Sequence, residues 1–235
     1  MSLVKAMATV AGMTGLSRIA GFVRDILTAA YLGAGPVGDA FFIALKLPNF
    51  FRRVTAEGAF SIAFIPMYSK TLESENKEDA EKLASNAFMV MLSCLSVFTV
   101  LALVFMPYVI RVIAPGFSDD PNALSLASEL TRITFPYLLL MSLSALLGGM
   151  LNAVDRFAPF AIAPVLFNLS LISSIFLGGY FETIGHAMSW GVFVAGILQF
   201  VFLLGCIYRA GFRIIFSMPR FDSDMKKLFR LMGPA

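Results

Sequence analysis

Long apolar runs dominate the chain, and the polar stretches between them recur at intervals typical of a membrane protein built from helices. About 20 apolar residues are enough for a helix to cross a bilayer. The pattern predicts all-α structure, a polytopic transmembrane helix bundle that forms a single domain over 1–235. Spanning helices are expected at about 6–32, 37–68, 85–112, 127–151, 158–180 and 185–208, and a seventh helix is expected to start within 222–235.

Prolines and charges modify this pattern. The first two predicted spans are long and interrupted by charged residues, and the second contains Pro48 and Gly58, between which we expect a bend or a break. Pro136 and Pro164 are expected to kink the fourth and fifth spans. The polar stretch 69–84 is predicted to be a connecting loop.

The composition supports a membrane protein. Hydrophobic residues make up 58% of the chain and charged residues 14%, whereas soluble domains have about 25% charged residues. The two cysteines, Cys94 and Cys206, lie in apolar runs and are interpreted as ordinary packing residues. The single histidine, His186, has no cluster of Cys, His or Asp near it in the sequence, which argues against a zinc site. We therefore expect neither a metal nor a cofactor.

The distribution of basic residues predicts the orientation. Stretches rich in Lys and Arg alternate along the chain with stretches that have few of them. The rich stretches are 69–84, 152–157 and 209–230, and the poor ones are 32–36, the loop with Asp119 and Asp120, and 178–185. The positive-inside rule then places the N-terminus in the cytoplasm. The first part of the last rich stretch, 209–221, is interpreted either as a segment along the membrane surface or as an ordinary basic loop.

Charged residues also lie inside the first predicted span, although an arginine or aspartate at the bilayer centre costs about 2.5–3.5 kcal/mol. They are Arg18, Arg24 and Asp25. At 100° per residue, Arg18 and Asp25 share one stripe, whereas Arg24 points about 120° away from Arg18. Either the helix is irregular near Gly21, or protein or water flanks it on two sides. The small residues Ser17 and Gly21, four positions apart, permit close packing against a neighbouring helix.

The second predicted span repeats the pattern. Asp39, Lys46 and Arg53 are seven positions apart and form one stripe, and Arg52 lies about 100° off it. One interpretation is that the charges of both spans lie near helix ends and contact lipid headgroups. The other is an aqueous cavity in which the acids are counter-ions. Because cations outnumber acids, such a cavity would suit an anion, and arginine binds phosphate with two donors at once.

Several motifs resemble one known family. The run 13–68, which contains SRIAGFVRD and KLPNFFRR, resembles the N-terminal part of the MurJ/MviN family. These are the bacterial lipid II flippases of the multidrug/oligosaccharidyl-lipid/polysaccharide exporter superfamily. The motifs APGF at 114–117, ITFPY at 133–137 and MGPA at 232–235 are also similar to the family. The resemblance extends in order over essentially the whole chain.

The resemblance implies one lobe of a two-lobed, alternating-access transporter in the bacterial inner membrane. Family members move the undecaprenyl-pyrophosphate-linked peptidoglycan precursor, lipid II, from the inner to the outer leaflet. The family's cavity arginines match Arg18, Arg24 and Arg52, and its acidic positions match Asp39 and Asp25. With the adjacent Arg53, these residues form the predicted substrate-binding set.

The resemblance also implies partners. Family members are about twice as long as this chain, so a C-terminal lobe or a second chain is expected beside it. Lipid II and membrane lipids are the other expected partners, the cell-wall synthesis machinery is a further candidate, and no nucleic acid is expected. Alternative functions are the export of a drug or of another polyprenyl-linked glycan, or a non-transporting scaffold for cell-wall enzymes.

An enzyme is not expected, because the chain has no Ser/His/Asp set, no metal-ligand spacing, no Walker A motif and no glycine-rich dinucleotide turn. Other polar residues have structural interpretations. Asn168 and Gln199 are expected to hydrogen-bond between helices, and Glu129 is expected to form surface ion pairs with Arg111 or Arg132. The pair Gly148–Gly149 predicts a close contact between helices.

Overall fold

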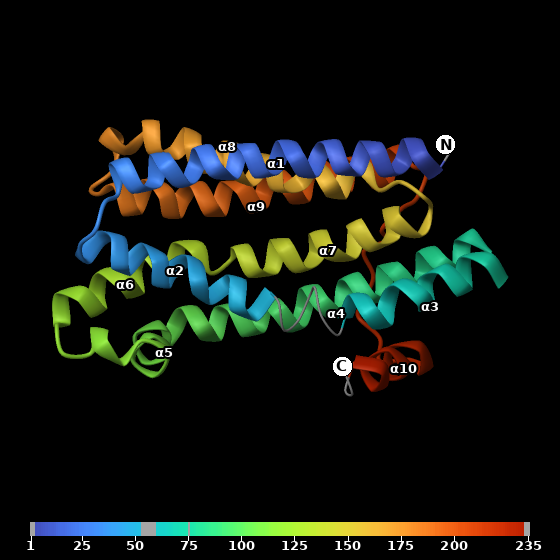
Figure 1. Ribbon diagram of the computed structural model, residues 1–235. Coiled ribbons are helices and arrows are strands. Elements are labelled where there is room, and N and C mark those ends of the chain that lie inside the picture. The colour runs from blue at the N-terminus through green and yellow to red at the C-terminus, as the bar shows by residue number, and fades with distance from the viewer. Residues whose placement is uncertain (1–2, 53–59, 75, 233–235) are drawn as a thin grey trace.

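The computed structural model describes residues 3–52, 60–74 and 76–232, and every regular element in these ranges is helical (Figure 1). The all-α prediction is therefore confirmed for the described residues. The α-helices are α1 (Leu3–Tyr31), α2 (Pro36–Arg52), α3 (Ser61–Ser74), α4 (Lys77–Val104), α5 (Met106–Ile113), α6 (Pro121–Thr134), α7 (Tyr137–Ala153), α8 (Ala158–Phe176), α9 (Ile184–Arg209) and α10 (Ser223–Met232). Two 3-10 turns, η2 (Pro115–Phe117) and η3 (Gly178–Tyr180), follow α5 and α8.

Four helical segments in the described part are long and apolar enough to cross a membrane. They are Lys77–Val104, Pro121–Ala153, Ala158–Phe176 and Ile184–Arg209, and they overlap the last four predicted spans. With 29 residues, α1 is about 43 Å long at 1.5 Å per residue and exceeds the thickness of a bilayer core. Because α1 and α2 carry charges along their length, the fold combines apolar spanning helices with two charged ones.

Turns divide two of the predicted spans. Phe135 and Pro136 form a turn between α6 and α7, so the interruption expected at this proline is present. A second break, at Phe105 between α4 and α5, was not predicted. Pro107 follows it in the first turn of α5, where its missing N–H has no helical partner to lose. Pro164 lies inside α8, which continues past it as an α-helix.

The second predicted span, 37–68, belongs to two helices. The first, α2, continues through Pro48 and ends at Arg52, and α3 begins at Ser61. The break that we expected before Gly58 falls on 53–59, which lie outside the described residues.

The stretch 69–84, predicted to be a loop, is mostly helical, because α3 extends to Ser74 and α4 begins at Lys77. The side chain of Asn76 caps α4 by accepting a hydrogen bond of 2.9 Å from the Asp79 backbone N–H. Lys82 pairs with Asp79 at 3.1 Å across one helical turn. Capping and neighbouring opposite charges therefore extend the helices beyond their apolar portions.

The helices form an elongated bundle (Figure 1). One side is made by α1, α8 and α9, with α8 packed against both of the others. Helices α2, α6 and α7 lie in the middle, and α7 contacts α9, α4 and α3. The groove described below opens where the charged helices α1 and α2 approach α7 and α8.

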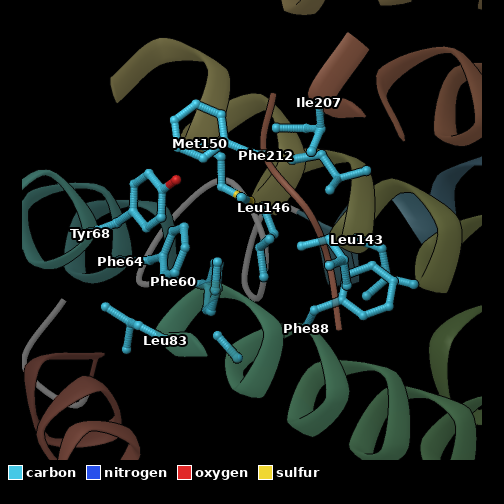
Figure 2. Packing of buried hydrophobic residues seen from close by; sticks show 14 of the residues in the cluster. Phe60, Phe64, Tyr68, Leu83, Phe88, Leu143, Leu146, Met150, Ile207 and Phe212 are labelled. Atoms are coloured by element: carbon cyan, nitrogen blue, oxygen red, sulfur yellow. The ribbon is translucent and has the colours of Figure 1, made fainter. Parts of the chain in front are cut away.

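A core of buried aromatic and aliphatic side chains joins α3 and α4 to α7 (Figure 2). The ring of Phe64 stacks on Phe60 and Tyr68, with centroid distances of 5.2 and 5.5 Å. The close contact predicted at Gly148–Gly149 is confirmed. A Cβ atom on Gly148 would collide with the Phe160 ring of α8, so α7 and α8 approach closely because this position is glycine.

The segment between α9 and α10, residues 212–222, is non-helical and follows the surface of α4; we call it the strap. The backbone N–H of Ile215 donates to Ser85 Oγ at 2.9 Å. The Asn86 side chain donates to the Arg220 carbonyl and accepts from the Arg220 N–H, both at 2.8 Å. The protein itself therefore holds this basic stretch in place, which neither sequence-based interpretation anticipated.

Candidate functional site

A groove of about 540 Å³ lies among the charged residues of α1 and the polar residues of α2, α8 and α9. Its lining residues are Ser17, Arg18, Gly21, Arg24, Leu45, Asn49, Tyr137, Met141, Pro164, Phe167, Asn168 and Gln199. Two of the predicted site residues, Arg18 and Arg24, thus meet at one groove. The lining residues in the described part include cations and amides but no acid.

Helix α1 presents both arginines without any irregularity. It is one continuous helix from Leu3 to Tyr31, so the suggested irregularity near Gly21 is wrong. Arg18 and Arg24 approach the groove from the two flanks of Gly21, and their long side chains bridge the angle of about 120° between them. The prediction that Gly21 faces a neighbouring helix is confirmed, because a Cβ atom there would lie 3.6 Å from Asn168 Nδ2 of α8.

Arg24 is held by contacts on two sides. Its Nη1 donates to Asn168 Oδ1 at 2.8 Å, and its Nε and Nη2 donate to Asp25 Oδ1 at 3.1 and 2.7 Å. The guanidinium carbon also lies 5.8 Å from the ring centroid of Phe167. The Arg24 side chain is 24% exposed and that of Asp25 is 66% exposed. These contacts fix the position of the guanidinium at the groove.

Asn168 connects this arginine to the backbone of α1. Its Nδ2 donates to the Ser17 carbonyl at 3.0 Å while its Oδ1 accepts from Arg24. The two bonds fix the orientation of the amide, since only the oxygen can accept and only the nitrogen can donate. Asn168 is 5% exposed. The prediction that Asn168 bonds between helices is confirmed, as it is for Gln199, whose Nε2 donates to the Ala163 carbonyl at 2.7 Å.

Two further cations extend the positive surface. Arg18 is exposed and has no hydrogen-bond or ion-pair partner among the described residues. Lys46, also exposed, lines an adjoining groove of about 490 Å³ that shares Leu45 and Asn49 with the first. Lys46 was expected among the cations of the second predicted span but not in the predicted site. The regular spacing of charge along α2 was the signal that pointed to it.

The remaining predicted residues lie elsewhere. Asp25 binds Arg24 but is not a lining residue of the groove. Asp39 is exposed in the first turn of α2, where its charge complements the helix dipole, and it is also outside the lining. Arg52 is the last residue of α2, and its side chain is outside the described part. Arg53 lies outside the described residues.

A second polar cluster lies away from the groove. Glu129, Glu182 and His186 each have a donor atom within 4.8 Å of the others'. The neighbours of His186 in this cluster are glutamates and not the Cys, His or Asp considered from the sequence, and the fold brings Glu129 to it from 57 positions earlier. The prediction that Glu129 forms surface ion pairs with Arg111 or Arg132 is wrong. Among the described residues, Arg132 donates instead to the Leu103 carbonyl, and Arg111 lies over the Tyr108 ring.

Sequence comparisons identify relatives of the chain. Residues 28–235 match the family model described as lipid II flippase MurJ. The whole chain is similar to the probable lipid II flippase MurJ of Rhizobium tropici, with 42% identity, and covers 45% of that protein. It is also similar to the lipid II flippase MurJ of Burkholderia cenocepacia, with 38% identity over 86% of this chain and 39% of the relative. The chain spans about half the length of the curated relatives it matches.

Two solved structures share the fold. One is a lipid II flippase MurJ in an inward closed conformation, with a TM-score of 0.78 and 28% identity over 95% of this chain and 46% of that one. The other is a MOP superfamily transporter from Pyrococcus furiosus, with a TM-score of 0.74 over 98% of this chain and 51% of that one. Its 15% identity supports the shared fold alone. Taken with the sequence matches, these similarities show that the chain belongs to the lipid II flippase MurJ family of membrane proteins.

Proposed function

We propose that this chain is the N-terminal lobe of a lipid II flippase and that its groove binds the pyrophosphate of the lipid-linked precursor. The observation that carries the proposal is the convergence of Arg18 and Arg24 on one groove without a lining acid, with Lys46 beside it. A pyrophosphate presents several anionic oxygens, and a planar guanidinium binds two of them at once. The wider predicted set also includes Asp25, Asp39, Arg52 and Arg53.

The cationic groove is energetically reasonable only where water, protein or an anion meets the charges. A cation facing lipid at the bilayer centre costs about 2.5–3.5 kcal/mol on insertion scales. Arg24 avoids part of this cost through Asn168 and Asp25, whereas Arg18 has no such partner among the described residues. An anionic headgroup in the groove would supply the missing partner. The lipid tail would remain in the bilayer beside the bundle.

The orientation proposed is a cytoplasmic N-terminus. Two of the stretches rich in Lys and Arg lie together, because the Arg213 backbone N–H of the strap donates to Glu81 Oε1 of α4 at 3.2 Å. Figure 1 shows the N-terminus, the start of α4 and the end of α7 towards the same end of the bundle. Such clustering of basic stretches at one end supports the assignment by the positive-inside rule. The groove would then receive its ligand from the cytoplasmic leaflet.

Transport requires a second lobe, supplied by the rest of a longer protein or by another chain. Alternating access depends on two bundles that move about a shared site. The substrate carries negative charge outward, so an inside-negative membrane potential would assist by about 2.3 kcal/mol per charge per 100 mV. We therefore expect that residues 1–235 alone, reconstituted in liposomes, do not move labelled lipid II. Translocation by this chain alone would contradict the two-lobed mechanism.

Groove polarity separates this function from its alternatives. The solved Pyrococcus furiosus transporter is described as having a binding pocket of reverse polarity that suggests a different function, so polarity differs between proteins of this fold. The cationic groove here disfavours a cationic drug. Export of another polyprenyl-linked glycan would use the same phosphate chemistry, so competition between several lipid-linked sugars distinguishes it from lipid II transport. A scaffold for cell-wall enzymes would not need the groove at all.

The direct test is a chimera in which this chain replaces the N-terminal lobe of the Rhizobium tropici relative, expressed in a strain depleted of its own flippase. Arg18→Lys and Arg24→Lys preserve charge but remove two-oxygen binding, so each is expected to impair growth and lipid II translocation. Arg213→Lys, an exposed change in the strap, is the matched control and should behave as the unmodified chimera. Full growth with both groove substitutions combined would overturn the proposed recognition.

A further inference from the structure

The cluster formed by Glu129, Glu182 and His186 combines one imidazole with two carboxylates, at a place remote from the groove. Glu129 comes from α6, Glu182 from the turn that precedes α9, and His186 from the first turn of α9. Figure 1 shows α6 and the start of α9 at the end of the bundle away from the N-terminus. Both glutamates are exposed, whereas His186 is 7% exposed.

The imidazole of His186 is unusual because one of its nitrogens is buried without a hydrogen bond. Nδ1 lies 2.8 Å from the Thr183 hydroxyl, which also accepts from the His186 backbone N–H at 3.3 Å. Nε2 lies 3.4 Å from Glu129 Oε1 but does not have hydrogen-bond geometry, and it has no other partner among the described residues. Burying a polar atom without a hydrogen-bond partner costs free energy, so a ligand bound to this nitrogen would be stabilising.

From this arrangement we infer a binding site for a divalent transition-metal cation of the zinc type, with His186 Nε2 and one oxygen each from Glu129 and Glu182 as ligands. A tetrahedral zinc ion with bonds of about 2.0–2.1 Å holds its donor atoms about 3.4 Å apart. The distance between Nε2 and the Glu129 oxygen already has this value. The Glu182 oxygen lies within 4.8 Å of both of these atoms. Because the Glu182 side chain is exposed, it can rotate to bring its oxygen to the distance that the ion requires.

The surroundings of the imidazole support the same assignment. With its proton on Nδ1, His186 donates to Thr183 Oγ1 and presents the Nε2 lone pair to the cation. This hydrogen bond fixes the tautomer and the ring orientation, as outer contacts of metal-bound histidines do. The negative charge of the two carboxylates exceeds the partial positive charge at the N-terminus of α9. The nearby Arg132 donates to the Leu103 carbonyl and not to these carboxylates. Mixed nitrogen and oxygen donors favour zinc over magnesium or calcium, which prefer oxygen alone.

Three protein ligands leave a fourth position for water or for another molecule. Because its ligands belong to α6 and to the start of α9, the bound ion would join these two helices at one end of the bundle. Neither helix end contributes a cation to the groove, so occupancy of this site and binding in the groove can be measured separately.

The test is titration of the purified chain in detergent with zinc chloride, followed by calorimetry and by thermal unfolding. We expect one ion per chain, a higher Tm with zinc than with EDTA, and no comparable effect of magnesium. Glu129→Gln and Glu182→Gln change exposed side chains and should fold, and each should weaken zinc binding at least about tenfold. Asp119→Asn, an exposed acid outside the cluster, is the matched control and should leave zinc affinity unchanged.

Cobalt provides the spectroscopic readout of the nitrogen ligand. Co²⁺ in the unmodified protein should give the visible absorption of a low-coordinate nitrogen and oxygen site, and His186→Gln should abolish it. Equal zinc affinity in the two glutamate variants and in Asp119→Asn would overturn the assignment and show non-specific surface binding. Equal stabilisation by zinc and magnesium would also overturn it, because oxygen-only binding does not use His186.

Discussion

The contact between Arg24 and Asn168 predicts a measurable coupling between α1 and α8. Arg24→Met removes the donor and Asn168→Leu removes the acceptor with similar side-chain volumes, so together they form a double-mutant cycle. The loss of the ion pair with Asp25 occurs in both variants that lack Arg24 and cancels from the coupling energy. The cycle therefore reports the bond of 2.8 Å between Nη1 and Oδ1.

The magnitude follows from the kind of bond and from its exposure. Hydrogen bonds to charged groups contribute about 1.5–3 kcal/mol in soluble proteins. Bonds between helices in a membrane protein average about 0.6 kcal/mol and reach about 1.7 kcal/mol. The charge strengthens the bond between Arg24 and Asn168, while the 24% exposure of the arginine lets water compete. We therefore expect a coupling energy of about 1–2 kcal/mol.

The assay is equilibrium unfolding of the purified chain and its variants in mixed detergent micelles, with the free energy of unfolding determined for each. The control cycle combines Arg24→Met with Gln199→Leu. Gln199 lines the same groove but donates to the Ala163 carbonyl, so these two changes should be additive within about 0.5 kcal/mol. A coupling below about 0.5 kcal/mol in the Asn168 cycle, or one equal to the control, would refute the argument that Asn168 positions the arginine.

Two other predictions concern the scaffold. Gly148→Ala should lower the free energy of unfolding by about 1–3 kcal/mol, because the new methyl group displaces the Phe160 ring. Gly205→Ala has no atom within 4 Å of the new Cβ and should be neutral or stabilising by up to about 1 kcal/mol; equal losses in both variants would contradict the packing argument. Asn86→Ala removes the hydrogen bonds to the Arg220 backbone and should speed tryptic cleavage after Arg220 at least about tenfold. An unchanged cleavage rate would mean that other contacts hold the strap.

Hydropathy located the apolar helical segments but not the break at Phe105, because length and composition are local properties of the sequence. It failed where polar chemistry extends a helix. The charged stretch before residue 85 was expected to be a loop, yet the cap from Asn76 and the pair formed by Lys82 with Asp79 make it helical. A membrane-spanning stretch ends where the apolar residues end, whereas the helix ends where its hydrogen bonds and caps end.

The candidate site was predictable only in part. Charges within an apolar run identified Arg18 and Arg24, because such residues are costly in a membrane unless they have partners. The partner Asn168 lies 144 positions later than Arg24, and no local pattern connects the two. An angle of 100° per residue gives only the direction in which a side chain leaves the helix, whereas two long arginines reach the same groove from opposite flanks of Gly21. The fold, more than the sequence pattern, determines which polar residues meet.

If the groove binds pyrophosphate as proposed, the contacts of the two arginines assign them different parts in binding it. A guanidinium has five N–H donors, and Arg24 already uses one each from Nε, Nη1 and Nη2, which leaves two. Arg18 has all of its donors free among the described residues, and Lys46 adds three more at the adjoining groove. An incoming phosphate would therefore bind first to the adaptable Arg18 and would compete with Asp25 for Arg24. Because Asn168 binds Arg24 from the other side, displacing Asp25 would leave the guanidinium in position, with donors free for a second phosphate oxygen.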